Sequence, residues 1–310
     1  ITKTALPRSG AGPPTKGALH MARWLQDNMP RIVLAPSFIA VMVFVYGFIG
    51  WTAWVSLTRS RLMPRYEFDS FIQYERLADS PRFETAMVNL AIFGTLFIVI
   101  AMVLGLLLAI LLDQKIRTEG AIRTIYLYPM ALSMIVTGTA WKWILNPELG
   151  IEATVKGWGF ANFKFNWLVD PDMAIYTVVL AAVWQSSGFV MALFLAGLRS
   201  VDEEIIKAAQ VDGIPTWRVY SAIIIPSMAP IFLSAFIVLA HLAIKAFDLV
   251  IALTGGGPGY ATDLPATYMY AMAFSRGDIG QAASSAMVMM LVVFTIVVPY
   301  LYSELRTKDD

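Results

Sequence analysis

The stretch RSVDEEIIKAAQVDGIPTWRVYSAIIIP, residues 199–226, is a polar segment between two long apolar runs. Its residues predict a short helix, a tight turn and a second short helix. We expect Asp202 to cap the first helix, because isoleucines and alanines follow it at helical spacing. Gly213 tolerates the left-handed conformation that ends a helix, and Pro215 suits the first position of the next one. The segment either docks a partner or merely joins two membrane helices.

The composition of the 310-residue chain is that of a membrane protein. Hydrophobic residues make up 58% of it and charged residues 15%, and the mean hydropathy is +0.65. Its apolar runs are long enough, at about 20 residues each, to cross about 30 Å of hydrocarbon. We therefore expect an all-α polytopic membrane protein with six transmembrane helices, at residues 32–57, 88–112, 122–145, 173–198, 222–253 and 282–303.

Six spans divide the chain into three parts: a tail of residues 1–31, a transmembrane domain of residues 32–303 and a tail of residues 304–310. The first tail is rich in proline and glycine and is expected to be disordered. It is not expected to be a signal peptide, because it lacks the apolar core of one. An even number of spans puts both tails on one side. Lysine and arginine in the first tail and in the loop after the second span predict that this side is cytoplasmic. Pro129 is expected to kink the third span.

The residues also exclude several functions. With no cysteine and only two histidines, neither a disulfide framework nor a multi-histidine metal centre is possible. A net charge of +1 gives no support for nucleic-acid binding. The glycine-rich loop at 254–260 is not a phosphate loop, since no lysine follows the glycines, and the motifs of membrane hydrolases are absent. We expect no cofactor in this chain and no ATP hydrolysis by the usual route, so any energy that it uses must come from a partner.

The fifth span contains His241, Lys245 and Asp248, spaced i, i+4 and i+7. This spacing predicts one helical face. Because a charge near the membrane centre costs roughly 2.5–3.5 kcal/mol, such residues tend to face a cavity or a partner. The three either line a translocation path or form a local lysine–aspartate ion pair. In the fourth span, residues 184–189 combine aromatic rings with amide and hydroxyl groups, which would suit a sugar ring, but their small and polar side chains equally suit a helix-packing seam.

The pattern Ala208-Ala209-x-x-Asp212-Gly213, followed by Tyr220 and Pro226, resembles the EAA loop of membrane subunits of binding-protein-dependent ABC importers. In that family the loop forms a cytoplasmic coupling helix that docks in a groove of the ATPase subunit. The resemblance implies a type I ABC importer permease fold. Lys207 stands where the family usually has glutamate. We therefore expect the residue on the ATPase that pairs with position 207 to differ from the family's, whereas the docking itself should be the same. The implied ATPase-coupling residues are Lys207, Ala208, Ala209, Asp212 and Gly213.

The resemblance extends along most of the chain. Residues 123–143, 247–258 and 299–306 look like carbohydrate permeases of this class, most of all the glucose/mannose permeases of Gram-negative bacteria. It implies a multi-pass protein of the bacterial inner membrane, with both termini cytoplasmic. The implied partners are a second permease subunit, a dimer of ATPase subunits that binds ATP and Mg, and a periplasmic sugar-binding protein.

The substrate path is predicted from the resemblance and from the polar residues together. Sugar-contacting positions of a maltose relative align with Gln185, Ser186 and Phe189, and with positions 239, 242, 243 and 246, which are apolar here. We predict a path through Gln185, Ser186, Phe189, His241, Lys245 and Asp248, and a contact with the binding protein at Gly256, Gly257 and Pro258. The alternatives are an importer for an α-glucoside, a polyol or glycerol-3-phosphate, and a self-sufficient carrier.

Overall fold

The computed structural model describes residues 16–63, 65, 67–114 and 118–307, and its regular elements in this range are helices apart from one isolated bridge between Thr58 and Phe68. The chain divides into two compact units, residues 1–52 and residues 53–310. The two units are taken in turn below.

The first unit is a continuous helical rod. It comprises α1 (Lys16–Val41), the π-helical turn η1 (Met42–Tyr46) and the start of α2 (Gly47–Ser56). The segment predicted as a disordered tail is therefore helical from Lys16 on, and residues 1–15 lie outside the described residues. Residues 16–31 of that segment contain two alanines, two leucines and two methionines, which are good helix formers. The described side chains of this rod are mostly apolar and exposed, as on a helix that faces lipid or another subunit.

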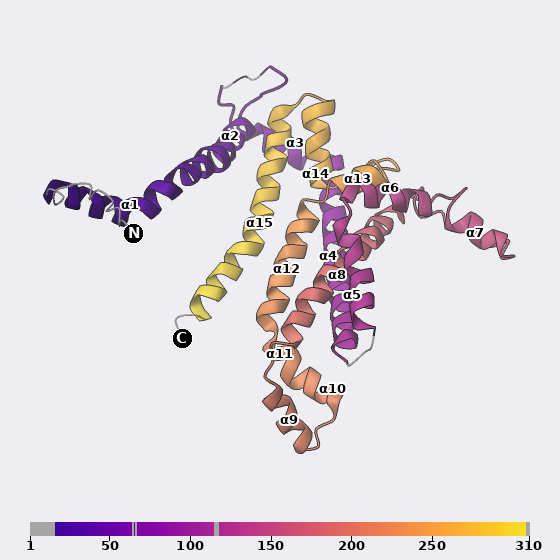
Figure 1. Ribbon diagram of the computed structural model, residues 1–310. Helices are drawn as coiled ribbons and strands as arrows, with labels where there is room; N and C mark the ends of the chain where they lie inside the picture. The colour runs from indigo at the N-terminus through magenta and orange to yellow at the C-terminus, as the bar shows by residue number, and fades with distance from the viewer. Residues whose placement is uncertain (1–15, 64, 66, 115–117, 308–310) are drawn as a thin grey trace, which may run out of the picture. The chain divides into compact units, whose positions relative to one another are not determined.

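The second unit contains the other helices (Figure 1). Three short non-α turns interrupt them, the 3₁₀ turn η2 (Tyr128–Ala131) and the π-helical turns η3 (Tyr220–Ile224) and η4 (Ala271–Ser275). The α-helices are α3 (Ile72–Ala78), α4 (Pro81–Asp113), α5 (Glu119–Leu127), α6 (Met134–Ile144), α7 (Ile151–Gly157), α8 (Ala174–Leu198), α9 (Glu203–Val211), α10 (Thr216–Val219), α11 (Ile225–Ser227), α12 (Ala229–Ile244), α13 (Asp248–Leu253), α14 (Pro265–Tyr270) and α15 (Ile279–Thr307).

Four helical stretches of the described chain are long and apolar enough to cross a membrane: residues 28–56, 81–113, 174–198 and 279–299. A fifth candidate is the pair 216–227 and 229–244, which is bent by 67°. These stretches match the first, second, fourth, fifth and sixth predicted spans. The count of six stays a prediction, because the third predicted span is broken into shorter helices.

That third span is divided more sharply than the predicted kink. Helix α5 ends before Pro129, which lies in the 3₁₀ turn η2, and Leu132 is extended. Proline has no N–H to continue the helical ladder. Ser133 then starts α6 anew, since its Oγ accepts a hydrogen bond from the Val136 N–H at 3.3 Å. The result is two short helices in place of one kinked span.

The core of the second unit lies around α8, the most buried of the four apolar stretches. Ala101, Gly105 and Ala109 recur every four residues along α4 and are all buried, which lets the α8 side chain Val190 approach the α4 backbone. Helix α8 also approaches α5 closely, because a Cβ atom on Gly188 of α8 would lie 1.9 Å from the Tyr126 carbonyl oxygen of α5. Only glycine permits this contact between α5 and α8.

Two ends of this unit matter for function, and they lie at opposite ends of α4, α8 and α12 (Figure 1). We call one of them the α9 end, which contains α9 and α10. The other is the α14 end, which contains α3, the loop of residues 254–264 and α14.

Candidate functional site

At the α9 end, residues 199–226 fold much as their sequence predicts. The Glu204 N–H donates a hydrogen bond of 2.9 Å to Asp202 Oδ1, which confirms the predicted cap. Gly213 has a φ of +73°, and the Ile214 N–H reaches back 3.0 Å to the Ala209 carbonyl oxygen, which confirms the turn. Pro215 precedes α10 instead of opening it, because its ψ of 142° is extended. The prediction was wrong there by one residue.

The predicted coupling residues lie on α9 and in the turn that follows it. Ala209 is buried and packs against the main hydrophobic core, whereas Lys207, Ala208, Asp212 and Gly213 are exposed. Large apolar side chains are exposed beside them, including Val211, at 88%, and Trp217. A turn that presents apolar side chains among polar ones has the character of a protein-docking surface.

Side chains from other helices fasten this segment to the bundle. The Tyr220 hydroxyl donates to Asp113 Oδ2, at the end of α4, at 2.7 Å. Arg199, after α8, pairs with Glu119 of α5 at 2.7 Å. The sequence analysis missed these contacts, since Tyr220 and Asp113 are 107 residues apart and each stands in an unremarkable polar context.

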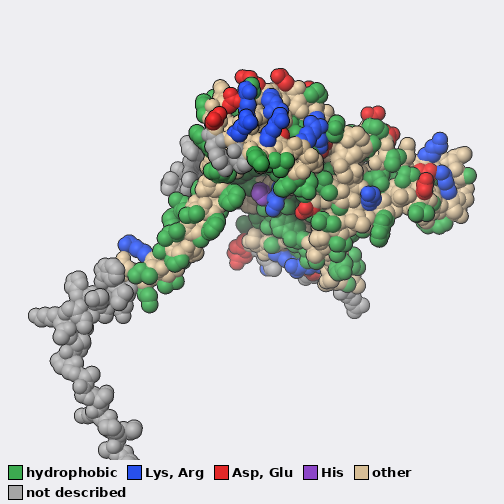
Figure 2. Space-filling model, turned by 90° about the horizontal axis from the view of Figure 1, so that it is seen from above, with side chains coloured by type: hydrophobic (Ala, Val, Ile, Leu, Met, Phe, Trp, Pro, Cys, Tyr) green, Lys and Arg blue, Asp and Glu red, His purple; other side chains and the backbone are tan. Residues whose placement is uncertain are grey.

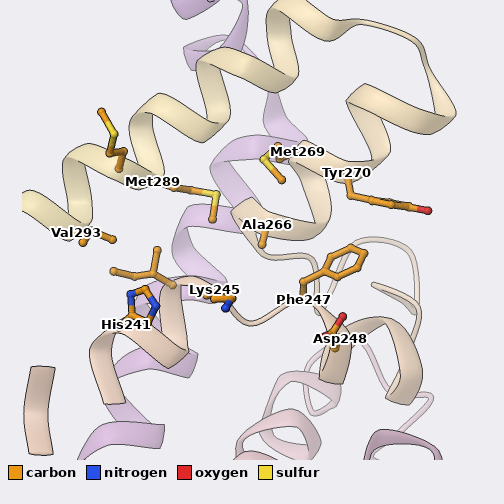
Figure 3. A pocket seen from close by; sticks show the side chains of 11 residues that line it. His241, Lys245, Phe247, Asp248, Ala266, Met269, Tyr270, Met289 and Val293 are labelled. Carbon is orange, nitrogen blue, oxygen red and sulfur yellow. The ribbon is translucent and has the colours of Figure 1, made fainter. Parts of the chain in front are cut away.

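In the middle of the unit, a cavity of about 420 Å³ lies between α12, α13, α14 and α15. It brings together His241, Lys245 and Asp248 and adds the rings of Phe247 and Tyr270 (Figure 3). Among the described residues, the polar atoms of the three predicted residues make no hydrogen bond to one another. Lys245 and Asp248 also form no ion pair with each other within that part of the chain.

The three residues do not share one helical face, so that prediction was wrong. Helix α12 ends at Ile244, Lys245 follows it, and Asp248 opens α13. A lysine at a helix C-terminus and an aspartate in a first turn each complement the helix dipole, which favours two helices over one. Lys245 and Asp248 also line a smaller hollow of about 160 Å³ on the side of Phe93 and Phe97.

Gln185, Ser186 and Phe189 lie elsewhere, inside the bundle on α8. The Gln185 side-chain nitrogen Nε2 donates to the Leu132 carbonyl oxygen at 2.7 Å and so satisfies the backbone at the break between α5 and α6. Ser186 is buried, and Phe189 packs against the main core. None of the three lines the 420 Å³ cavity. The six predicted pathway residues thus form two separate groups.

The glycine-rich loop at the α14 end, which holds Gly256, Gly257 and Pro258, is fixed by polar side chains. The Thr254 and Thr262 hydroxyls lie 2.6 Å apart at its base. The Asn89 side-chain nitrogen lies 3.4, 3.1 and 3.0 Å from the carbonyl oxygens of residues 260, 261 and 263, so that its two N–H groups serve all three, one of them shared between two acceptors. One side chain of α4 therefore fixes the backbone of residues 260–263, the part of the loop that leads into α14.

An ion pair adds to this support. Arg82 Nε lies 2.6 Å from Asp263 Oδ2, and the Asp263 side chain is only 2% exposed. The Thr267 hydroxyl donates to the other carboxylate oxygen at 2.6 Å. The Arg82 guanidinium also lies over the Tyr260 ring, 4.4 Å from its centroid. Sequence reasoning did not predict this pair, because Arg82 is one of several arginines in a mixed-charge loop.

Comparison with known proteins identifies the family. Residues 101–306 match the model of the binding-protein-dependent transport system inner membrane component. The chain belongs to this family. The matched segment contains α9, every residue that lines the 420 Å³ cavity, and the glycine-rich loop.

Relatives of this transport component match along nearly the whole chain. A probable ABC transporter permease protein of Pyrococcus horikoshii is 39% identical over 286 residues, which covers 91% of this chain and 98% of the relative. The xylose/arabinose import permease protein XacH of Haloferax volcanii is 36% identical over 273 residues, 87% of this chain and 86% of that protein.

The crystal structure of a bacterial ABC transporter involved in the import of the acidic polysaccharide alginate has the same fold. It matches with a TM-score of 0.80 at 20% identity and covers 93% of this chain and 99% of that one. The predicted all-α fold of a type I ABC importer permease is confirmed.

Proposed function

We propose that this membrane component is the permease subunit of an ATP-driven sugar importer and forms half of its translocation path. The observation that carries the proposal is the capped, exposed helix α9 with its left-handed Gly213, within a chain of this family. Sugar as the solute class is supported by the names of relatives, among them the xylose/arabinose permease and the trehalose/maltose transport system permease protein MalF of Thermococcus litoralis, which is 28% identical over 281 residues.

The energy comes from a dimer of ATPase subunits, which binds ATP and Mg and docks on α9. Tyr220 and Arg199 link this docking surface to the ends of α4, α5 and α8, so a displacement of α9 pulls on those helices. ATP binding shifts the permease between inward-facing and outward-facing states only to the extent that the ATPase contacts differ between them.

The sugar passes the 420 Å³ cavity, whose size is that of a small-molecule site. His241, Lys245 and Asp248 offer donors and acceptors for hydroxyl groups, and Phe247 and Tyr270 offer apolar ring faces. A glucose- or mannose-like sugar suits this mixture. Glycerol-3-phosphate suits it less than a neutral α-glucoside or polyol, because Asp248 repels an anion. Contact of the sugar with Gln185, Ser186 and Phe189 stays a prediction.

The glycine-rich loop is proposed to meet a periplasmic sugar-binding protein through Gly256, Gly257 and Pro258. A solved alginate transporter with the same fold, TM-score 0.78, is in complex with an alginate pentasaccharide-bound periplasmic protein. In this arrangement the α14 end is periplasmic, and the α9 end and both termini are cytoplasmic. A second permease subunit completes the path in the inner membrane.

Reconstitution in liposomes tests the proposal. The chain is assembled with its partner permease, ATPase and binding protein, and uptake of a labelled hexose is measured with a panel of unlabelled sugars as competitors. We expect uptake that requires ATP and every subunit. Sugar flux through this chain alone overturns the proposal in favour of a self-sufficient carrier.

The cavity is tested with Asp248→Asn. We expect lower sugar uptake with unchanged assembly of the ATPase on the complex, because the variant removes an acceptor from the cavity without touching α9. The matched control is Asp172→Asn, an exposed aspartate outside the cavity. If both variants transport with the parent kinetics, the charges at 245 and 248 are structural.

A further inference from the structure

Three aromatic rings form a ladder that begins in the cavity and continues beyond it. The Phe247 and Tyr270 ring centroids lie 4.8 Å apart, and the Tyr270 and Phe274 centroids are also 4.8 Å apart. Successive rings are tilted by 47° and 37° and therefore present connected edges and faces. Phe247 comes from the break between α12 and α13, and the other two come from α14 and η4.

The ladder runs from the inside of the cavity to its rim. Phe247 and Tyr270 line the cavity, whereas Phe274 does not. Phe247 is half-buried, Tyr270 is 42% exposed and Phe274 is 76% exposed. In Figure 3, Tyr270, Phe247 and Asp248 follow one another along one side of the space. Figure 2 views the second unit from the α14 end, where hydrophobic side chains are exposed among clusters of charged ones.

Its chemistry fits a sugar ring better than a lipid chain. Pyranose rings bind aromatic side chains through their C–H faces while their hydroxyl groups stay free for hydrogen bonds. Tyr270 supplies a hydroxyl that has no hydrogen-bond partner among the described residues. At its inner end the ladder meets Asp248 and Lys245, polar groups that suit hydroxyls and that an acyl chain would leave desolvated. Phe274 lies in a π-helical turn, a form that often marks functional positions.

We propose that Phe274, Tyr270 and Phe247 are a stacking track that receives a neutral sugar ring at the α14 end and passes it to the 420 Å³ cavity. The proposal rests on the proposed sugar-import function. Phe274 binds the ring first, Tyr270 holds it through its face and its hydroxyl, and Phe247 delivers it beside Asp248. Because each ring touches the next, the sugar moves between rungs without losing all its contacts at once.

The test replaces Phe274 in the complete reconstituted transporter by leucine, alanine, tyrosine and tryptophan. Sugar uptake and binding-protein-stimulated ATP hydrolysis are measured in the same liposomes. We expect Phe274→Leu and Phe274→Ala to lower the sugar delivered per ATP about two- to tenfold, the range that aromatic contacts confer. Phe274→Tyr and Phe274→Trp retain it. ATP hydrolysis stays at the parent level in all four, because the loaded binding protein still docks.

The matched control is Phe71→Leu, an exposed phenylalanine at the same end that pairs with Tyr74 outside the cavity and leaves sugar uptake unchanged. If Phe274→Leu transports as well as the parent, the ladder is an apolar packing face for the second permease or for lipid, and the proposal fails. A parent transporter that takes up no sugar of the panel points instead to failure of the proposed function.

Discussion

The α14 end and the α9 end of the second unit are held together in opposite ways. At the α14 end, the carboxylate of Asp263 is nearly inaccessible and is bound by both Arg82 and Thr267, while Asn89 holds three carbonyl groups. At the α9 end, the Arg199 side chain is 45% exposed and its pairs are open to water. Removing one partner of a buried ion pair strongly destabilises the fold, whereas exposed ion pairs contribute little to its stability. We infer that the α14 end is a preformed entrance, which we call the mouth. Helix α9 and the turn after it are easily displaced, and we call them the lever.

The sharpest test of this contrast is Asp263→Asn. The variant leaves the Arg82 guanidinium without its counterion in a mostly buried position, and we expect a loss of about 3–5 kcal/mol of stability. The thermal unfolding midpoint of the purified transporter in detergent measures the loss. The control is Asp69→Asn, which breaks the exposed pair with Arg59 at the same end and should change stability by less than about 1 kcal/mol. Equal midpoints for the two variants contradict the preformed mouth.

Gly213→Val tests the lever. A left-handed conformation costs an L-residue roughly 1–2 kcal/mol, and more when the side chain is β-branched. The fraction of α9 in its docking geometry should fall about tenfold or more, and sugar uptake and stimulated ATP hydrolysis should fall with it. Insertion into the membrane should stay normal, as measured by the amount of protein in purified membranes.

Gly120→Val is the matched control for this lever variant. Gly120 lies near the same end, in α5, and nothing within 4 Å would touch an added Cβ atom. We expect nearly full transport. Normal transport by Gly213→Val as well would remove the coupling role of the turn.

Tyr220→Phe should have the smallest effect. It removes the hydrogen bond to Asp113 and the longer one, 3.3 Å, that Gln114 Nε2 donates to the same hydroxyl, a loss on the order of 1 kcal/mol where water can take the place of the tyrosine. We expect the sugar transported per ATP to fall up to about fivefold while ATP hydrolysis continues. Tyr128→Phe, an exposed tyrosine without a recorded hydrogen bond among the described residues, should leave the ratio unchanged. A ratio that falls equally in both variants argues against a specific link at Tyr220.

Local signals in the sequence predicted a coupling helix at residues 202–213, which the structure has at 203–211, together with its cap and its turn, because each depends on neighbouring residues. Apolar length predicted most of the spans for the same reason. Pro129 predicted a kink but not the full break at residues 128–133, and the break at 245–247 was not predicted, since hydropathy continues across both. The Arg82–Asp263 pair was also missed, because it joins residues 181 positions apart, and nothing in either neighbourhood names the other.

The interruption at residues 245–247 distributes the polar residues of the cavity over two separate helices and leaves Lys245 in the turn between them. His241 belongs to α12, and Asp248 belongs to α13. Any hinge-like bending at this point changes the spacing between the cationic and anionic sides of the chamber along with its width. A single local rotation therefore changes both the volume of the cavity and the strength with which its polar groups bind a molecule inside it. Opening of the cavity and release of the bound molecule are then coupled.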